Sequence, residues 1–211
     1  MAPVLSMQAV QFARSGRQIL SAFDLAVAAG EHTLLLGPSG SGKTTLLNLA
    51  AGLLTPDSGR IAIAGTAMPG PASARDSLRR THVGIVFQTL RLVSALTVSG
   101  NLELAARLSG KPADGIGQLL ETLGIGHRSR ASPRELSQGE AQRAAIARAI
   151  VSRPLLLLAD EPTSALDDRN ADMVARLLLD SAAAHGSTLV IATHDTRLRR
   201  YIGHVVELEA G

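Results

Sequence analysis

The chain has 211 residues, which is enough for one hydrophobic core and too few to require two independent domains. Apolar residues make up 45% of the chain and charged residues 18%, a composition typical of globular proteins. Cysteine is absent, which excludes disulfides and thiolate metal sites and favours a cytoplasmic protein. No stretch approaches the roughly 18 apolar residues of a membrane-spanning helix, so we expect the chain not to enter a membrane by itself.

The net charge is +3, and all of the 21 basic residues except Lys43 and Lys111 are arginine. Arg75, Arg79 and Arg80 form a local cluster, which is more often a solvated face than a binding site. Aromatic residues, on which nucleic-acid bases stack, amount to only 2% of the chain. We therefore expect no nucleic-acid partner.

Hydrophobic patterning predicts an α/β core. The segments 32–36, 83–87, 155–159 and 188–192 are continuously apolar, as strands of a parallel sheet covered on both faces are. Earlier extended segments, 4–12 and 23–27, with hairpin-type turns at Ser15-Gly16 and Ala29-Gly30, predict a small antiparallel β lobe. Segments 98–108 and 117–123, between breaks rich in Gly and Pro, predict a helical insertion.

A glycine-rich segment with the sequence GPSGSGKTT lies between a predicted strand and the helical run LLNLAAGL. Glycines in such a loop let successive backbone N–H groups converge on phosphate oxygens, next to a helix N-terminus. We expect Lys43 to neutralise the β- and γ-phosphates of a nucleotide and Thr44 to bind Mg²⁺ through its hydroxyl. The alternative is a simple turn before a helix, which the full pattern disfavours. The predicted phosphate site comprises Gly37, Pro38, Ser39, Gly40, Ser41, Gly42, Lys43, Thr44 and Thr45.

Two carboxylates follow the predicted strand LLLLA and precede Pro162. Ligands of open α/β sheets bind at this end of the strands. Because side chains alternate along a strand, Asp160 and Glu161 point in different directions and can do different work. We expect Asp160 to support Mg²⁺ and Glu161 to act as general base toward the water that attacks the γ-phosphate. The alternative reading is a pair of solvated acids.

Further motifs complete a family pattern in the expected order. LSQGE at 136–140 is similar to the signature sequence of ABC ATPases, Gln88 in GIVFQ to the Q-loop, SALD at 164–167 to the D-loop, and His194 in ATHD to the switch histidine. The resemblance implies a P-loop NTPase core of the ABC ATPase type, with a small antiparallel β lobe and a helical insertion. It further implies one domain, 1–211, in which 1–88 and 154–211 form the β lobe and RecA-like core and 89–153 form the helical subdomain.

The resemblance also implies roles for single residues. Gln88 would contact Mg²⁺ and the attacking water, and His194 would contact the γ-phosphate. Ser137 and Gly139 would bind the γ-phosphate held by a partner chain, with help from Asp167, so that two ATP molecules join a homodimer or heterodimer. The segment from Ser137 to Glu140 also reads as S-x-x-E, which predicts a capped helix start.

Two features depart from the family pattern. Gln138 replaces a glycine, and Glu140 replaces a common glutamine and puts a negative charge near the phosphate-facing end of the helix. The aromatic residue that usually stacks on adenine is not evident. Arg14 or Ser15 stands near its place, and we expect the Arg14 guanidinium to lie flat on the base.

Family members of this size usually drive a separate integral-membrane permease, from the cytoplasmic face of the inner membrane. The segment 87–102 is similar to the region of lipoprotein-releasing and macrolide-efflux type ATPases that docks the permease. This favours export or release of lipophilic cargo. An importer subunit and a cell-division-type ATPase that signals through a permease-like partner remain alternatives. A DNA-maintenance or translation ATPase is disfavoured, because it would need a coiled-coil insertion or a second ATPase domain.

Overall fold

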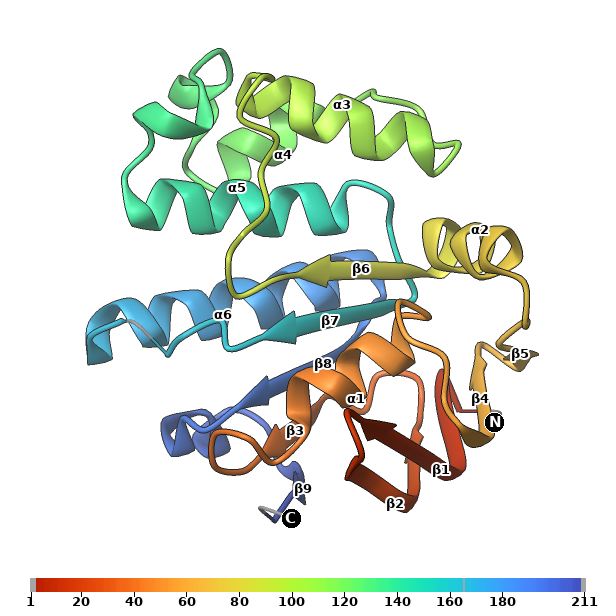
Figure 1. The fold of residues 1–211 in the computed structure, drawn as a ribbon. Coiled ribbons are helices and arrows are strands. Elements are labelled where there is room, and N and C mark those ends of the chain that lie inside the picture. The colour runs from red at the N-terminus through yellow and green to blue at the C-terminus, as the bar shows by residue number, and fades with distance from the viewer. Residues whose placement is uncertain (1–2, 165, 210–211) are drawn as a thin grey trace.

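A five-stranded parallel sheet forms the centre of the computed structural model, which describes residues 3–164 and 166–209 (Figure 1). Its strand order is β6-β7-β8-β3-β9, and every neighbouring pair is parallel. The strands are β3 (Thr33–Leu36), β6 (Val83–Val86), β7 (Leu156–Asp160), β8 (Thr188–Thr193) and β9 (His204–Glu207). The four strands predicted from apolar runs are confirmed, and β9, which is only half-buried, was not predicted.

A second, antiparallel sheet has the order β2-β1-β4-β5. Its strands are β1 (Leu5–Arg14), β2 (Arg17–Val27), β4 (Ser58–Ile63) and β5 (Thr66–Ala67). The turn at Ser15-Gly16 joins β1 and β2 as a hairpin, as expected, with Arg14 opposite Arg17. The hairpin expected at Ala29-Gly30 was wrong. The chain turns there but passes into β3 of the other sheet, and the Gly30 N–H donates to the Thr188 hydroxyl at 2.9 Å.

Alternate side chains of each parallel strand enter two different cores, which explains why these strands are apolar throughout. Leu156 and Leu158 of β7 pack in one cluster with α1 (Lys43–Ala50) and the antiparallel sheet. Leu157 and Ala159 pack in the other with α5 (Gln138–Ile150) and α6 (Asp168–His185). The sheet is therefore buried on both faces.

The helical insertion lies over one side of the parallel sheet (Figure 1). It contains α3 (Val98–Leu108) and α4 (Ile116–Thr122), which pack on α5 and agree with the predicted segments within one residue. The helix α2 (Ala72–His82) was not predicted, because none of its residues is buried and it therefore lacks an apolar stripe. It carries the arginine cluster. No helix in the described ranges combines the length and the apolar character needed to cross a membrane.

The helical layer and the sheet approach each other closely at Gly84 of β6. A Cβ at this position would lie 2.3 Å from the carbonyl oxygen of Ala149, near the end of α5, and 2.9 Å from Pro154. No heavy atoms can be that close without a shift of the backbone. The absence of a side chain at Gly84 therefore sets the distance between α5 and the strand that leads to Gln88.

We predict that Gly84→Ala lowers the free energy of unfolding by about 1–3 kcal/mol, because the added methyl group must push α5 away from β6. Denaturant unfolding followed by circular dichroism measures this. Gly117→Ala in α4 is the matched control, since a Cβ there meets nothing within 4 Å. It should be neutral or stabilising by up to about 1 kcal/mol. Equal stability of the two variants would contradict the proposed close approach.

Candidate nucleotide site at the carboxyl edge of the parallel sheet

The predicted catalytic residues and the predicted phosphate loop lie at the carboxyl ends of four neighbouring strands. β3 leads into the phosphate loop, residues 37–42, and β7 ends at Asp160. β6 ends two residues before Gln88, and β8 ends one residue before His194. The strand order β6-β7-β8-β3 places the four ends side by side. This is the edge at which open α/β sheets bind ligands.

The phosphate loop turns tightly around the amino group of Lys43. Gly40 and Gly42 have φ values of +84° and +89°, in the region that favours glycine. The Lys43 side chain is buried, and its Nζ donates to the carbonyl oxygens of Gly37 at 2.7 Å and Pro38 at 2.8 Å. The loop therefore holds a positive charge where its backbone and the start of α1 also attract an anion.

Two features of the phosphate loop fit an anion site: Gly37 is closely packed, and the Ser41 hydroxyl is buried without a partner among the described residues. A Cβ on Gly37 would lie 2.3 Å from the carbonyl oxygen of Leu208, whose own N–H donates to Leu36 at 2.7 Å. The Ser41 hydroxyl is buried and has no hydrogen-bond partner within residues 3–164 and 166–209. Buried polar groups of proteins are nearly always paired, so this hydroxyl suits a ligand that brings an acceptor.

Asp160 and Thr44 provide adjacent oxygen donors beside the loop. The Thr44 hydroxyl donates to Asp160 Oδ1 at 3.0 Å. Burial raises the pKa of Asp160, and the hydrogen bond from Thr44 opposes that rise. No cluster of three or more His, Cys, Asp or Glu side chains in the described part of the chain could hold a metal. One carboxylate and one hydroxyl fit Mg²⁺, which takes its other ligands from water and substrate phosphates.

Glu161 is fixed through both its backbone and its carboxylate. Its φ is +46°, an uncommon conformation for a residue other than glycine, and its N–H donates to the carbonyl oxygen of Ala192 at 2.8 Å. Oε2 accepts from the Thr193 hydroxyl at 2.8 Å, and Oε1 accepts from His194 Nδ1 at 3.0 Å. Oε1 also lies 3.8 Å from Lys43 Nζ. Asp160 and Glu161 thus have different partners, as expected from the sequence. The reason differs, because Glu161 lies beyond the end of β7 and its left-handed backbone directs its side chain.

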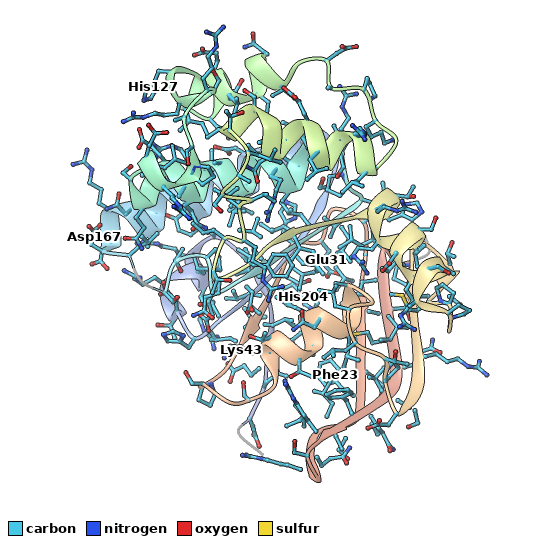
Figure 2. The ribbon with its side chains drawn as sticks, turned by 45° about the horizontal axis from the view of Figure 1, so that its top comes forward. Phe23, Glu31, Lys43, His127, Asp167 and His204 are labelled. Carbon is cyan, nitrogen blue, oxygen red and sulfur yellow. The ribbon has the colours of Figure 1, made fainter. Side chains whose placement is uncertain are left out.

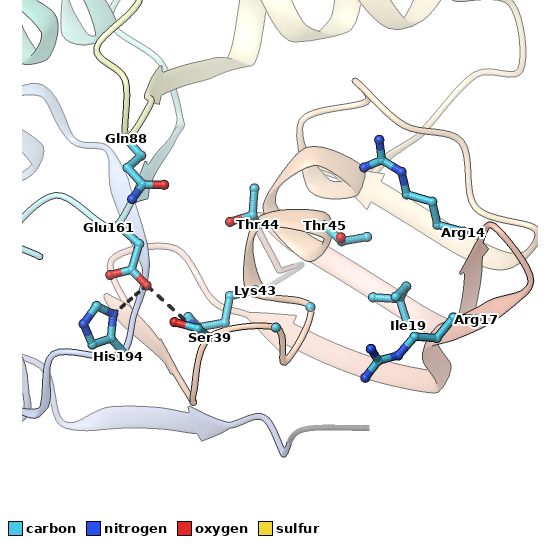
Figure 3. Close-up of a pocket in the computed structure, with 12 residues that line it drawn as sticks. Arg14, Arg17, Ile19, Ser39, Lys43, Thr44, Thr45, Gln88, Glu161 and His194 are labelled. Carbon is cyan, nitrogen blue, oxygen red and sulfur yellow. Dashed lines mark hydrogen bonds and ion pairs between the residues drawn. The ribbon is translucent and has the colours of Figure 1, made fainter.

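A cavity of about 480 Å³ joins these groups (Figure 3). Ten predicted site residues line it: Arg14, Ser39, Gly40, Gly42, Lys43, Thr44, Thr45, Gln88, Glu161 and His194. Four further predicted residues do not line the cavity but contact residues of the phosphate loop or its wall: Gly37, Pro38, Ser41 and Asp160. The structure therefore brings together every predicted residue except Ser137, Gly139 and Asp167.

Two residues of the cavity wall, Arg17 and Ile19 on β2, were not predicted from the sequence. Both lie with Arg14 on the side of the cavity opposite Glu161 (Figure 3). The register of the hairpin could have identified Arg17, because it pairs directly with Arg14. No described aromatic side chain lines the cavity, and Arg14, Arg17 and Ile19 form this part of its wall.

Ser137 and Gly139 lie at the start of α5, away from the cavity. The predicted capping box is present. Ser137 Oγ accepts from the Glu140 N–H at 3.3 Å, and the Glu140 carboxylate accepts from the Ser137 N–H at 2.8 Å. Arg128 Nε donates to the same carboxylate at 2.7 Å, which with the capping bonds lowers the pKa of Glu140 to about 2. The negative charge expected at this helix start is therefore paired with a local cation.

Asp167 also lies apart from the cavity. Its carboxylate caps α6 by accepting from the Asn170 N–H at 2.9 Å. Figure 2 shows Asp167 at the edge of the molecule, well separated from Lys43, and His127, the neighbour of Arg128, at the outer edge of the helical layer. Ala165 of the SALD segment is outside the described residues.

Comparisons with known proteins show which family the chain belongs to. Residues 20–164 match the family profile described as ABC transporter. The chain is 43% identical over 198 residues to the lipoprotein-releasing system ATP-binding protein LolD of Xanthomonas euvesicatoria, covering 92% of this chain and 81% of that protein. It is 42% identical over 200 residues to an uncharacterized ABC transporter ATP-binding protein of Mycobacterium tuberculosis, with the same two coverages.

Solved structures agree with the fold. The dimeric bacterial ABC transporter cassette MJ0796 superposes with a TM-score of 0.88 at 29% identity, covering 98% of this chain and 95% of that one. The ABC transporter component cbiO1 of Clostridium perfringens superposes with a TM-score of 0.89 at 30% identity, covering 100% of this chain and 86% of that one. The sheet, the phosphate loop and the sequence relationship lead to one conclusion: this chain belongs to the ABC transporter family.

Proposed function

We propose that this chain is the ATP-hydrolysing subunit of a transporter and drives a separate membrane permease that releases or exports lipophilic cargo. The observation that carries the ATPase part is the single cavity in which the phosphate loop, Gln88, Glu161 and His194 meet. The similarity to LolD proteins, whose name refers to lipoprotein release, supports the cargo class. Such a subunit would act at the cytoplasmic face of the inner membrane.

In the proposed reaction, ATP lies with its phosphates on the loop 37–42 and its base against the Arg14 side of the cavity. Lys43 leaves the two carbonyl oxygens that it now binds and neutralises the β- and γ-phosphates. Water attacks the γ-phosphorus, its proton passes to Glu161, and the bond to the bridging oxygen breaks with its electron pair going to ADP. Thr193 and His194 hold the Glu161 carboxylate in place for this transfer.

Thr44, Asp160 and Gln88 are the residues that we propose hold Mg²⁺. A bound magnesium ion would neutralise negative charge on the phosphates, which phosphoryl transfer requires. Asp160 suits this role because burial already disfavours its isolated negative charge, so a cation beside it would be stabilising. Gln88 stands in the cavity wall and begins the segment that leads to the helical layer.

We further propose that two chains close around two ATP molecules, so that Ser137 and Gly139 bind the γ-phosphate held by the partner. Neither residue lines the cavity of its own chain, which supports this, as does the dimeric state of the similar cassette MJ0796. The N-terminus of α5 offers N–H groups and a favourable dipole to an anion. Whether the two chains are identical depends on the transporter.

Lys43→Ala should abolish ATP binding, because the loop loses the charge at its centre. Glu161→Gln should retain ATP binding and lose turnover by about 10²–10⁴-fold, since the amide cannot accept the proton. Nucleotide binding by fluorescence and phosphate release by a coupled assay measure the two properties. Lys111→Ala, which changes the other lysine of the chain at an exposed turn, should leave both unchanged. Full turnover in Glu161→Gln would refute its role.

A complementation assay tests the site across the dimer. Ser137→Arg and Lys43→Ala should each abolish hydrolysis alone, and an equimolar mixture should recover part of it. The recovered site pairs the phosphate loop of the Ser137→Arg chain with the Ser137 of the Lys43→Ala chain. Ser132→Arg is the control, because Ser132 caps the preceding 3₁₀ helix in a similar capping box. That variant should keep full turnover. Mixtures that stay inactive would argue for a site within one chain.

The permease would dock on a second hollow, of about 320 Å³, between β6 and the helical layer. Phe87 and Arg91 of the segment 87–102 line it, and Leu53 and Leu108, which are exposed, add apolar surface. Exposed leucines at a hollow are typical of a surface that a partner covers. The similarity of this segment to permease-docking regions supports the assignment.

Leu108→Asp should remove the permease from the tagged chain purified from gently solubilised membranes, because a charge would be buried on docking. Hydrolysis by the isolated chain should persist. Leu155→Asp is the control, since Leu155 is similarly exposed but lies outside the hollow. A permease with few spans and a large extracytoplasmic domain would support release or efflux. An importer-type permease would reverse the proposed direction, and a soluble partner alone would refute transport.

A further inference from the structure

One guanidinium group connects the two loops that follow β7 and β8. It belongs to Arg197, in the 3₁₀ helix Thr196–Arg200 directly after His194 and Asp195. Arg197 Nε donates to Asp195 Oδ1 at 2.8 Å and Nη2 donates to Asp195 Oδ2 at 2.7 Å. This two-point contact fixes the plane of the guanidinium, as a lysine could not.

The same guanidinium reaches the loop after β7. Nη2 donates to the carbonyl oxygen of Leu166 at 3.3 Å, and Nη1 pairs with Asp168 at the start of α6. The buried Thr163 hydroxyl donates to Asp195 Oδ2 at 2.7 Å and closes the connection from the other side. The segment from Thr163 to Asp168 is thus tied to the His194 loop at three points.

The connection continues to the catalytic carboxylate that we propose. The Asp195 N–H donates to the Thr193 hydroxyl at 3.0 Å, and that hydroxyl donates to Glu161 Oε2. These two hydrogen bonds have ordinary lengths, and Asp195 is almost completely buried. Its pKa is lowered to about 2, above all by the Arg197 hydrogen bonds, so the carboxylate stays ionised and the bridge persists at neutral pH.

We infer that Arg197 is a positioning residue for hydrolysis, which holds Leu166 and Asp168 of the loop after β7 together with the His194 loop. The inference rests on the proposed function, in which two chains close around ATP, and on the expectation from the sequence that Asp167, next to Asp168, acts across that dimer. If Leu166 and Asp168 move when the dimer closes, Arg197 would pass that movement to Asp195. From Asp195 it would reach Thr193 and then Glu161. Arg197 does not line the cavity, so its proposed effect acts through Asp195.

Arg197→Gln should lower kcat for ATP hydrolysis by roughly 10–100-fold, the effect expected when a catalytic group is displaced by about 1 Å. KM for ATP should change by no more than about twofold, because the phosphate loop is untouched. Arg197→Lys should not restore kcat, since an ammonium cannot contact both loops in the same plane. Asp168→Asn, which weakens only the exposed end of the bridge, should lower kcat in the same direction by a smaller factor.

Arg199→Gln is the matched control, because Arg199 lies on the same 3₁₀ helix and makes an exposed ion pair with Glu207. It should retain kcat and KM. Thermal unfolding of all variants separates lost positioning from lost folding: Arg197→Gln should still unfold cooperatively and still bind ATP. Unchanged kcat in Arg197→Gln, or full recovery in Arg197→Lys, would overturn the inference. If the unaltered chain shows no hydrolysis that depends on Lys43, the proposed function fails instead.

Discussion

The pairing of β3 between β8 and β9 is the constraint on which the rest of the site depends. Parallel pairing on both sides leaves β3 no freedom to slide, so the phosphate loop starts at one fixed point. The hydrogen bond from Leu208 to Leu36 and the close contact at Gly37 extend this constraint into the first residue of the loop. The position of Lys43 relative to Asp160 and Glu161 therefore depends on the pairing of β3.

Parallel strands also explain how groups far apart in the sequence share one cavity. A parallel sheet buried on both faces brings all its carboxyl ends to one edge. Polar side chains at this edge lie beyond the strands and need not be buried in the apolar core. At this edge the acids, the lysine, the histidine and the hydroxyls form a nearly continuous network. Gln88 follows β6 at the same edge of the sheet, and the close contact of β6 with α5 of the helical layer favours glycine at position 84.

Local patterns were sufficient to predict much of this architecture. Continuous apolar runs identified four parallel strands, and GPSGSGKTT between a strand and a helix identified the phosphate loop. The capping box at Ser137 was predicted from four letters, and the structure contains it. Such features depend on residues that are neighbours in the chain, so the sequence displays them directly.

Features that depend on distant residues could not be predicted in this way. The helix α2 has no apolar stripe, and the turn at Ala29-Gly30 was misread as a hairpin because its destination is decided by pairing with β8. The pairing of Glu140 with Arg128 was likewise invisible, so its charge seemed to be exposed. The bridge made by Arg197 joins loops about thirty residues apart, and only the folded chain shows it.

The left-handed backbone at Glu161 has a consequence for the evolution of this chain. A residue with φ of +46° is strained unless it is glycine, and asparagine or aspartate tolerate the conformation better than other side chains. A descendant that abandons hydrolysis would therefore gain stability by replacing Glu161 with one of these residues, whereas β-branched replacements would be selected against. Under the proposed role of Glu161 as general base, the backbone conformation favours loss of catalysis at this position, and selection for turnover would oppose it.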